Sequence, residues 1–372
     1  PLPTPHPGGA LRREPQFRVR CLLSRAMLCL VPAFMGTPAA AQDEDPLRID
    51  LHSHPSRFHR ANVPRISDEE IARYLDRGMD AVVATISTDT PYRGGYVLRD
   101  GTRIEGGNRR PDPAEPWEYT LDRFERLTRT VAEGNAVFVR TPAEARKARA
   151  DGALAILPAV EGADSLEGRI ERLHELHRMG LALAQLVHFR PNGIGHIQTW
   201  PYTPGGLTEF GREVVRECNR LGIVIDLAHA NPETIRDTLA LSTAPVIFSH
   251  TGAFALGEAD RNLRDPEILA IAEDGGVIGI WPNGSQVPTV SDMARHIRHV
   301  TDVGGLGAAG IGSDLRGMSS YSEGFGDEAN FEAIAEALAE AGFDSDDVEA
   351  ILGGNFERVW EAVTAHLPTS DP

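Results

Sequence analysis

Two histidines at positions i and i+2 end the first apolar run of the chain, in the sequence Ile49-Asp50-Leu51-His52-Ser53-His54. Side chains alternate across a β-strand, so His52 and His54 would project to the same side of it. If the strand belongs to a barrel, both imidazoles point into its mouth, where they could hold a metal ion. Taken alone, the pair is equally consistent with two solvated loop histidines.

Later apolar runs end in residues of the same types, and this favours the metal site. The residues at these ends are Glu161, His188, His229, His250 and Asp314. In a barrel of parallel strands, polar residues at the C-terminal strand ends converge on one site. Buried charges without partners are costly, so we expect these groups to neutralise one another through metal. Imidazole and carboxylate suit Zn²⁺, and a bridging carboxylate allows two ions.

Two such ions would lower the pKa of a shared water and polarise a carbonyl group, which serves hydrolysis of an amide or ester. No cysteine ends a predicted strand, so a thiolate site is excluded. The chain also lacks a Gly-x-Ser-x-Gly nucleophile motif, a Walker loop, and a Gly-x-Gly-x-x-Gly after the first strand. The residues therefore predict a metal-dependent hydrolase.

The elements that would position these residues alternate along the chain. The predicted strands are 47–52, 81–87, 153–160, 181–187, 223–228, 245–249, 277–281 and 310–314. Amphipathic helical patterns lie near 67–77, 117–133, 167–179, 207–221, 232–240, 265–273, 290–302 and 327–341. Eight such alternations predict an α/β protein with a single-domain (β/α)8 TIM-like barrel. A short strand at 136–140 and helices at 345–351 and 355–366 would be additions to it.

The segment 88–116 interrupts this rhythm, because it is rich in Gly, Pro and Arg and has no periodicity. We expect a long loop after the second strand, on the active face of the barrel. It would either contact substrate as a lid or only decorate the surface.

The first 41 residues have the order of a secretory signal peptide preceded by an upstream extension, residues 1 to about 17, rich in Pro and Arg. Arginines between positions 12 and 25 precede the apolar run 26–35, and Ala39-Ala40-Ala41 follows it. The apolar run is too short to span a bilayer. We therefore expect residues 42–372 to form the hydrolase barrel of an exported protein, periplasmic or secreted.

The charge and cysteine content restrict the partners. The formal net charge is −17; residues 1–41 hold five arginines and one glutamate, a net +4, so their removal would leave −21. A field of this sign repels nucleic acid and anionic membranes. Of the three cysteines, only Cys218 would remain, and one cysteine forms no internal disulfide. The expected partner is a small-molecule substrate, and the sequence leaves a homodimer open.

From about residue 47 to 366, the chain resembles the membrane (renal) dipeptidase family of dizinc metallopeptidases. The motifs that carry the resemblance are Glu161-Gly162 with Ser165-Leu166, Asp226-Leu227-Ala228-His229, Phe248-Ser249-His250, Arg261-Asn262, Gly310-Ile311-Gly312-Ser313-Asp314 and Gly353-Gly354-Asn355-Phe356 with Val359-Trp360. Each motif is short, but their order and spacing together are specific.

The resemblance implies a metal-ligand set. Glu161 would bridge two Zn²⁺ ions, with His229 and His250 completing the second ion. His52 and the residue at position 54 would complete the first.

The resemblance also implies roles in binding and catalysis. His188 would steady the substrate carbonyl and its oxyanion. Arg261 would clamp a substrate carboxylate, with Asn262 beside it in the substrate-binding set. Asp314 would pass a proton from the nucleophilic water to the leaving amine. The implied function is an exported zinc-dependent dipeptidase.

Two positions depart from the family pattern. His54 stands where the family carries aspartate, and Arg316 stands where it usually carries an acidic residue. Both changes make the site more positive, which could suit a more anionic substrate, and the imidazole at position 54 changes the affinity and metal preference expected of the first site. We therefore keep two alternatives: another amide or lactone hydrolase, acting for example on N-acyl amino acids with one metal, and a binding protein that has lost the chemistry.

The remaining histidines give weaker signals. His59 and His196 fall in predicted loops, where we expect solvated side chains. The helical patterns contain His174, His177, His296 and His299, which we expect on the surface.

Overall fold

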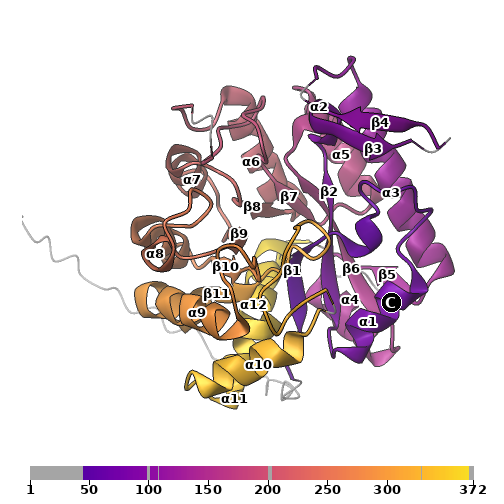
Figure 1. Ribbon diagram of the computed structural model, residues 1–372. Coiled ribbons are helices and arrows are strands. Elements are labelled where there is room, and N and C mark those ends of the chain that lie inside the picture. The colour runs from indigo at the N-terminus through magenta and orange to yellow at the C-terminus, as the bar shows by residue number, and fades with distance from the viewer. Residues whose placement is uncertain (1–44, 99–100, 108, 200–202, 328, 368–372) are drawn as a thin grey trace, which may run out of the picture. The chain divides into compact units, whose positions relative to one another are not determined.

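The computed structural model describes residues 45–98, 101–107, 109–199, 203–327 and 329–367 (Figure 1). The predicted signal peptide at 1–41 lies outside these residues. Among the helices that the structure describes, none combines the length and apolar character needed to cross a bilayer.

Eight parallel strands form the predicted barrel. They are β1 (Ile49–Ser53), β2 (Ala81–Ser87), β6 (Leu154–Glu161), β7 (Leu183–Gln185), β8 (Val224–Asp226), β9 (Ile247–Thr251), β10 (Val277–Ile280) and β11 (Ala309–Ile311). They pair in this order from β1 to β11. A parallel bridge between Ser53 and Leu315 brings the chain after β11 back to β1. The predicted extra strand is β5 (Ala136–Phe138), which pairs with β6 beside this path.

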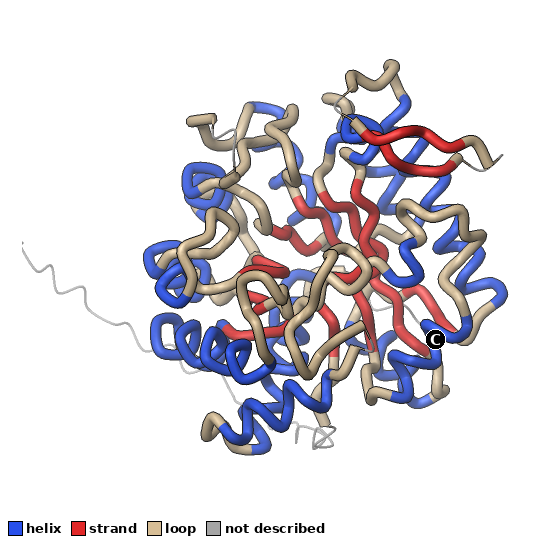
Figure 2. The backbone as a smooth tube through the Cα atoms, in the orientation of Figure 1, coloured by secondary structure: helices blue, strands red, loops and turns tan. Residues whose placement is uncertain are grey.

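Helices surround the strands (Figure 2). They are α1 (Asp68–Asp76), α3 (Glu115–Glu133), α4 (Pro142–Ala150), α5 (Ile170–Met179), α6 (Glu209–Leu221), α7 (Pro232–Leu239), α8 (Asp265–Glu273), α9 (Val290–Gly304) and α10 (Phe331–Glu340). Several begin at a side chain that accepts the backbone N–H three residues later; Ser67, Thr208 and Asn231 do so for α1, α6 and α7. Such N-caps satisfy one of the free donors at a helix start.

The N-terminal end of the barrel is filled by apolar side chains. The predicted C-terminal helices are α11 (Ser345–Glu349) and α12 (Asn355–Thr364), joined by the π-helical Ala350–Gly354. From α12, Phe356 and Trp360 pack with strand residues such as Ile49 and Val277 in one buried cluster. Burying an aromatic side chain of this size contributes roughly 1.5–3 kcal/mol. This end is therefore a packed core, and the opposite end is left for the site.

Two glycines allow three strands to approach closely next to the site. A Cβ at Gly279 in β10, or at Gly312 after β11, would lie 1.9 Å from the carbonyl oxygen of Ser249 in β9. Any larger residue at either position would push apart the strands that carry His250 and Asp314.

The segment 88–116, which we predicted to be an aperiodic loop, contains regular structure. It forms a short helix, α2 (Thr90–Arg93), and an antiparallel hairpin of β3 (Gly94–Val97) and β4 (Arg103–Gly106). The prediction was wrong here because the strands are four residues long and mostly exposed. Only Tyr96 is buried, against Tyr119 of α3, so the hairpin shows no alternation of apolar residues.

Candidate metal centre

The five predicted ligands meet at the carboxyl ends of four strands. They form two triads, one of His52, His54 and Glu161 and the other of Glu161, His229 and His250. Within each triad the possible ligand atoms all lie within 4.8 Å of one another, and every member is buried. Glu161, at the end of β6, belongs to both triads.

The first triad is open towards a cation. Nε2 of His52 lies 3.4 Å from Oε1 of Glu161, and Nε2 of His54 lies 3.5 Å from Oε2. Neither distance is a good hydrogen bond, and His52 Nε2 is buried with no hydrogen-bond partner among the described residues. An orphaned imidazole nitrogen facing a carboxylate fits a bound metal ion.

The second triad brings the Nε2 atoms of two imidazoles close together, with the rings edge to face. Nε2 of His229 and Nε2 of His250 lie 3.2 Å apart, and they lie 3.7 and 4.0 Å from Oε1 of Glu161. Burial lowers the pKa of both histidines well below the usual value, so both rings are neutral. Burial raises the pKa of Glu161, but the charges of His188 and His52 outweigh it and hold that pKa well below 4.5. Two neutral nitrogens beside a carboxylate are a donor set suited to Zn²⁺.

Neighbouring side chains hold the ligand rings in these orientations. The hydroxyl of Ser249 lies 2.9 Å from Nδ1 of His250 and 3.3 Å from Nδ1 of His52, so one residue contacts a ligand of each triad. The carbonyl of Thr85 lies 2.9 Å from Nδ1 of His54. Bonds at Nδ1 leave Nε2 as the nitrogen that faces the cation.

Glu161 is fixed from the neighbouring strand. Ser87 lies opposite it in the parallel register of β2 and β6, and its hydroxyl donates to Oε2 at 2.5 Å. The sequence does not predict these roles for Ser87, Ser249 and Thr85, because a polar residue within a strand gives no signal until the register is known.

Asp50 joins the first strand to the last. Its carboxylate accepts from the backbone N–H of Ser313 at 2.8 Å and from the Ser313 hydroxyl at 2.5 Å. The N–H of Asp314 donates to the carbonyl of His52 at 2.8 Å. These bonds place Asp314 beside His54, with 3.4 Å between Oδ1 and Nε2.

Two residues of the centre have unusual backbone angles. His229 has φ 70° and Asp314 has φ 45°, both in the left-handed region that non-glycine residues seldom adopt. Such a conformation costs on the order of 1–3 kcal/mol and persists where the surrounding structure imposes it. In this structure the His229 side chain lies beside Glu161, and the Asp314 side chain lies beside His54.

His188, which follows β7, lies between two carboxylates. Its Nδ1 is 2.9 Å from Oδ1 of Asp89, and its Nε2 is 3.1 Å from Oε1 of Glu161. Burial lowers the pKa of His188, but the charges of Asp89 and Glu161 outweigh it and raise the pKa to about 9. Asp89 also accepts from the N–H of Phe189 at 3.3 Å. No sequence pattern distinguishes Asp89, which stands within the segment predicted to be a loop.

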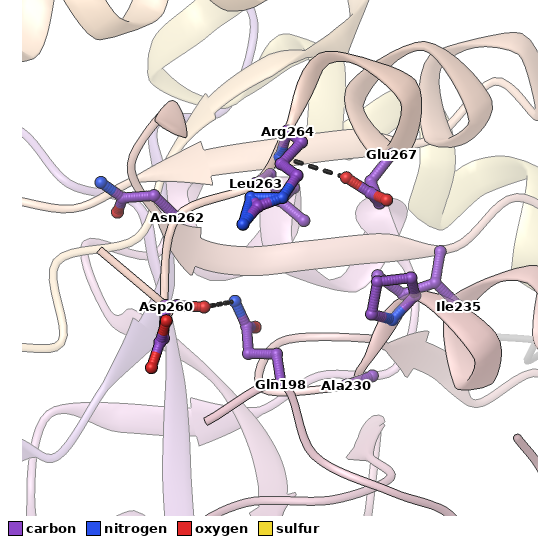
Figure 3. A pocket seen from close by; sticks show the side chains of 9 residues that line it. Gln198, Ala230, Ile235, Asp260, Asn262, Leu263, Arg264 and Glu267 are labelled. Carbon is purple, nitrogen blue, oxygen red and sulfur yellow. Dashed lines mark hydrogen bonds between the residues drawn. The ribbon is translucent and has the colours of Figure 1, made fainter. Parts of the chain in front are cut away.

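Arg261 approaches from the loop after β9. One guanidinium nitrogen donates to the carbonyl of His250 at 3.1 Å, another donates to Oε1 of Gln198 at 3.0 Å, and the group lies 5.0 Å from the Trp281 ring. Gln198 in turn donates to the carbonyl of Asp260 at 2.6 Å, as Figure 3 shows. No sequence pattern indicates that Gln198 is a partner of Arg261.

Asn262 is placed differently from Arg261. Its side chain accepts from the N–H of Gly252 at 3.1 Å and donates to the carbonyl of Gly257 at 2.7 Å. It lines a separate cavity of about 280 Å³ with Gln198 (Figure 3). Asn262 therefore shapes the loop that carries Arg261, and its contact with substrate stays a prediction.

A cavity of about 100 Å³ lies over the triads. Its walls include His54, His59, Arg60, His188, Arg261 and Asp314. The expectation that His59 is solvated was wrong, because its side chain is buried with its ring 4.0 Å from that of His54. The turn Pro55–Arg57, in which Ser56 and Arg57 have positive φ, folds the chain back over the cavity.

Arg316 does not add an uncompensated charge to this cavity. Its Nε lies 3.3 Å from Oε1 of the buried Glu70, and its Nη1 lies 3.9 Å from Asp327. Of the two departures from the family pattern, only His54 changes the charge among the ligands.

The comparisons with known proteins agree with this arrangement. The profile of the membrane dipeptidase family, peptidase family M19, matches residues 49–370. Dipeptidase tcpJ of Claviceps purpurea is 32% identical over 219 residues, which are 57% of this chain and 52% of that protein. An uncharacterized dipeptidase of Schizosaccharomyces pombe is 31% identical over 224 residues, 57% and 54% of the two chains. The chain thus spans about half the length of these curated relatives.

Two solved structures extend the likeness to most of the chain. The metallopeptidase dipeptidase AC, of family M19, is 25% identical with a TM-score of 0.73, covering 86% of this chain and 99% of its own. A metallopeptidase of Rhodobacter sphaeroides, with a phosphinate mimic of L-Ala-D-Ala bound, is 24% identical with a TM-score of 0.72, covering 86% and 100%. By its profile, its fold and its ligand triads, this chain belongs to the membrane dipeptidase family, peptidase family M19.

Proposed function

We propose that the protein is a zinc-dependent dipeptidase that hydrolyses dipeptides with a free C-terminal carboxylate. The observation that carries the proposal is the buried carboxylate of Glu161, shared by two triads whose other members are all imidazoles. Family membership and the dipeptidase names of the curated relatives support it.

The side chains around the triads have separate tasks in this reaction. Arg261 binds the substrate carboxylate through its guanidinium, and Gln198 and the His250 carbonyl hold that guanidinium in place. His188 donates a hydrogen bond to the carbonyl oxygen as negative charge develops on it. Asp314 accepts the proton of the attacking water and delivers it to the amine that leaves. Zn²⁺ held by the two triads would supply a water of lowered pKa and would polarise the carbonyl.

The number and identity of the metal ions are part of the proposal. Two Zn²⁺ ions, one for each triad, are expected. The test is metal content per chain by elemental analysis, together with turnover of a dipeptide panel by the zinc-loaded protein. A stable protein that stays metal-free in the presence of zinc and cleaves no dipeptide would overturn the proposal.

A second candidate function follows from His54. An imidazole in place of a carboxylate removes one negative charge from the first triad, which could leave a single ion and a different amide or lactone substrate. Adding N-acyl amino acids and lactones to the panel separates the two candidates. Turnover of these compounds without turnover of any dipeptide would favour the second.

We also propose that the protein is exported to the periplasm or secreted. The basic, apolar and small-residue order of positions 12–41 supports this. Fractionation and N-terminal mass analysis of the expressed protein test it, with cleavage after Ala41 as the expected result. Light scattering on the mature protein tests for a homodimer.

A further inference from the structure

A second cavity adjoins the metal cavity on the side of the β3–β4 hairpin. It measures about 650 Å³, and we call it the vestibule. Side chains that line it include Arg57, Arg60, Tyr96, Arg103, Glu105 and Arg316. Arg60 and Gly317 line both the vestibule and the metal cavity, so the two spaces meet at these residues.

Gly317 keeps this passage open. A Cβ at position 317 would lie 1.9 Å from Oδ1 of Asp314 and 2.7 Å from the ring of His54. Those two side chains line the metal cavity, so a group bound there reaches the vestibule past the glycine.

The vestibule is positively charged in a chain whose net charge is −17. Four arginines line it, and Glu105 is the one acidic side chain in its described lining. Arg316 is neutralised by Glu70. No carboxylate of the described residues forms an ion pair with Arg57, Arg60 or Arg103. A cleft with low-dielectric walls and charges of one sign concentrates ligands of the opposite sign.

Arg93 adds a further cation at the base of the hairpin. Its guanidinium lies 3.9 Å from the centroid of the Phe189 ring, which lines the metal cavity. Its Nη1 is buried with no hydrogen-bond partner among the described residues. Burial lowers the pKa of Arg93; the charge of Asp89 opposes this shift, and in smaller part the charge of Arg60 adds to it.

In the proposed reaction, the two ends of the metal cavity would bind different parts of a substrate. Arg261 stands beside His250 of the second triad, whereas Arg60 follows His59, whose ring lies on His54 of the first. A dipeptide with its carboxylate on Arg261 and its peptide bond at Glu161 therefore directs its N-terminal residue towards Arg60. This step rests on the proposed function. The cavity of about 100 Å³ is small, so the side chain of that residue extends into the vestibule.

We propose that the vestibule selects dipeptides whose N-terminal residue carries a carboxylate side chain, with Arg60 as the residue that determines this specificity. A glutamyl or aspartyl residue would place its carboxylate among Arg60, Arg57 and Arg103. A charge-assisted bond to a guanidinium is stronger than the bond that the neutral amide of glutamine could make.

The test compares Glu-Ala with Gln-Ala, which differ only in this charge. For the zinc-loaded protein, kcat/KM is expected to be about tenfold or more higher for Glu-Ala at low salt, and the ratio should fall as salt rises. In Arg60→Gln the ratio of the two kcat/KM values should fall to within about twofold of one, whatever happens to each rate. The matched control is Lys147→Gln, which removes one positive charge from the exposed side of α4 and should keep the wild-type ratio.

Ala-Ala separates failure of this inference from failure of the proposed function. If Ala-Ala is cleaved and Glu-Ala shows no advantage over Gln-Ala, the inference is wrong and the dipeptidase proposal stands. If no dipeptide is cleaved, the dipeptidase proposal fails. The inference is then tested by comparing the dissociation constants of Glu-Ala and Gln-Ala, measured by calorimetry. Equal constants would overturn it, and so would an unchanged preference in Arg60→Gln.

Discussion

Oδ1 of Asp89 lies 2.9 Å from Nδ1 of His188, and the second oxygen of Asp89 accepts the backbone N–H of the residue that follows His188. One buried carboxylate thus fixes both the ring and the main chain of His188. With Nδ1 occupied, Nε2 is the nitrogen that His188 presents to the cavity.

Asp89→Asn should lower kcat by roughly tenfold, less than the roughly 100-fold expected when an oxyanion donor such as His188 is removed. Asparagine keeps the shape but loses the charge that holds the imidazole proton. Steady-state kinetics on a cleaved dipeptide, with metal content measured in parallel, check this. Equal kcat for Asp89→Asn and wild type, at equal metal content, would contradict it. Exposed Asp112, in the same segment, offers the control Asp112→Asn.

Gln198→Leu should raise KM about tenfold and change kcat by less than about twofold. Gln198 holds the guanidinium of Arg261, which is expected to bind the substrate carboxylate equally in ground and transition states. A dipeptide amide, which lacks that carboxylate, is the control substrate. If Gln198→Leu raises KM for the dipeptide and for its amide to the same extent, Gln198 does not act through binding of the substrate carboxylate by Arg261.

Ser249→Ala should weaken binding of zinc by about 10–100-fold, because partners that orient ligand histidines contribute in this range. Ser249 contacts Nδ1 of both His52 and His250, so we expect both ions to be affected. Competition with a chromophoric chelator measures the two affinities. The exposed Ser345→Ala is the matched control. Loss of affinity for only one ion would show that the two triads are oriented independently.

Removal of metal should abolish activity and lower thermal stability. A ligand that binds only the folded state stabilises it by about 2.7 kcal/mol at a concentration 100 times its Kd. Zinc added after chelation should restore both activity and Tm. Glu161→Gln should lose activity by more than about 100-fold and show little rise of Tm with zinc, because the shared ligand is gone. Glu171→Gln, at an exposed position on α5, should respond to zinc as the wild type does.

Because of His296, we expect the folding stability to decrease in acid even when no metal is bound. This histidine was expected on a helix surface, but it is buried, and its Nδ1 accepts the N–H of Ala253 at 2.9 Å. Burial lowers the pKa of His296 to about 4; the charge of Asp292 opposes this shift, and the charges of Arg295 and His299 add to it.

The lowered pKa of His296 determines the direction in which folding stability changes with pH. The stability that neutral His296 provides is present above the unfolded pKa of about 6.5 and is lost as pH falls towards 4, by up to about 3 kcal/mol. Chelator-treated wild type should therefore lose more Tm between pH 7 and pH 4.5 than chelator-treated His296→Gln. Parallel pH profiles for the two proteins would contradict this.

The barrel could be predicted because parallel strands covered by helices are apolar on both faces. The run 81–87 coincides with β2, and 223–228 contains β8. The hairpin of β3 and β4 could not be predicted, because one of its faces is exposed and its strands are short. The hairpin lies beside the site because of tertiary packing, which a local sequence pattern does not reveal.

The predicted ligands could be found because they stand at strand ends, where the barrel itself determines convergence. The residues that orient them do not share this property. Ser249 lies one position before a ligand within its strand, and Asp89 and Gln198 lie in connections between elements. Their partners are distant in sequence, so only the folded chain identifies them. The same reason explains why His59 and His296 were expected in solvent.

The bonds from Asp50 to Ser313 form a seam between the beginning and the end of the barrel. During synthesis, His52 and His54 leave the ribosome long before Ser313. Asp50 of β1 therefore has no Ser313 to bond with until most of the domain has been synthesised. A truncated chain that ends before β11 would hold all five ligands and still lack this seam. We therefore expect zinc capture to come late in folding, once the two chain segments have met.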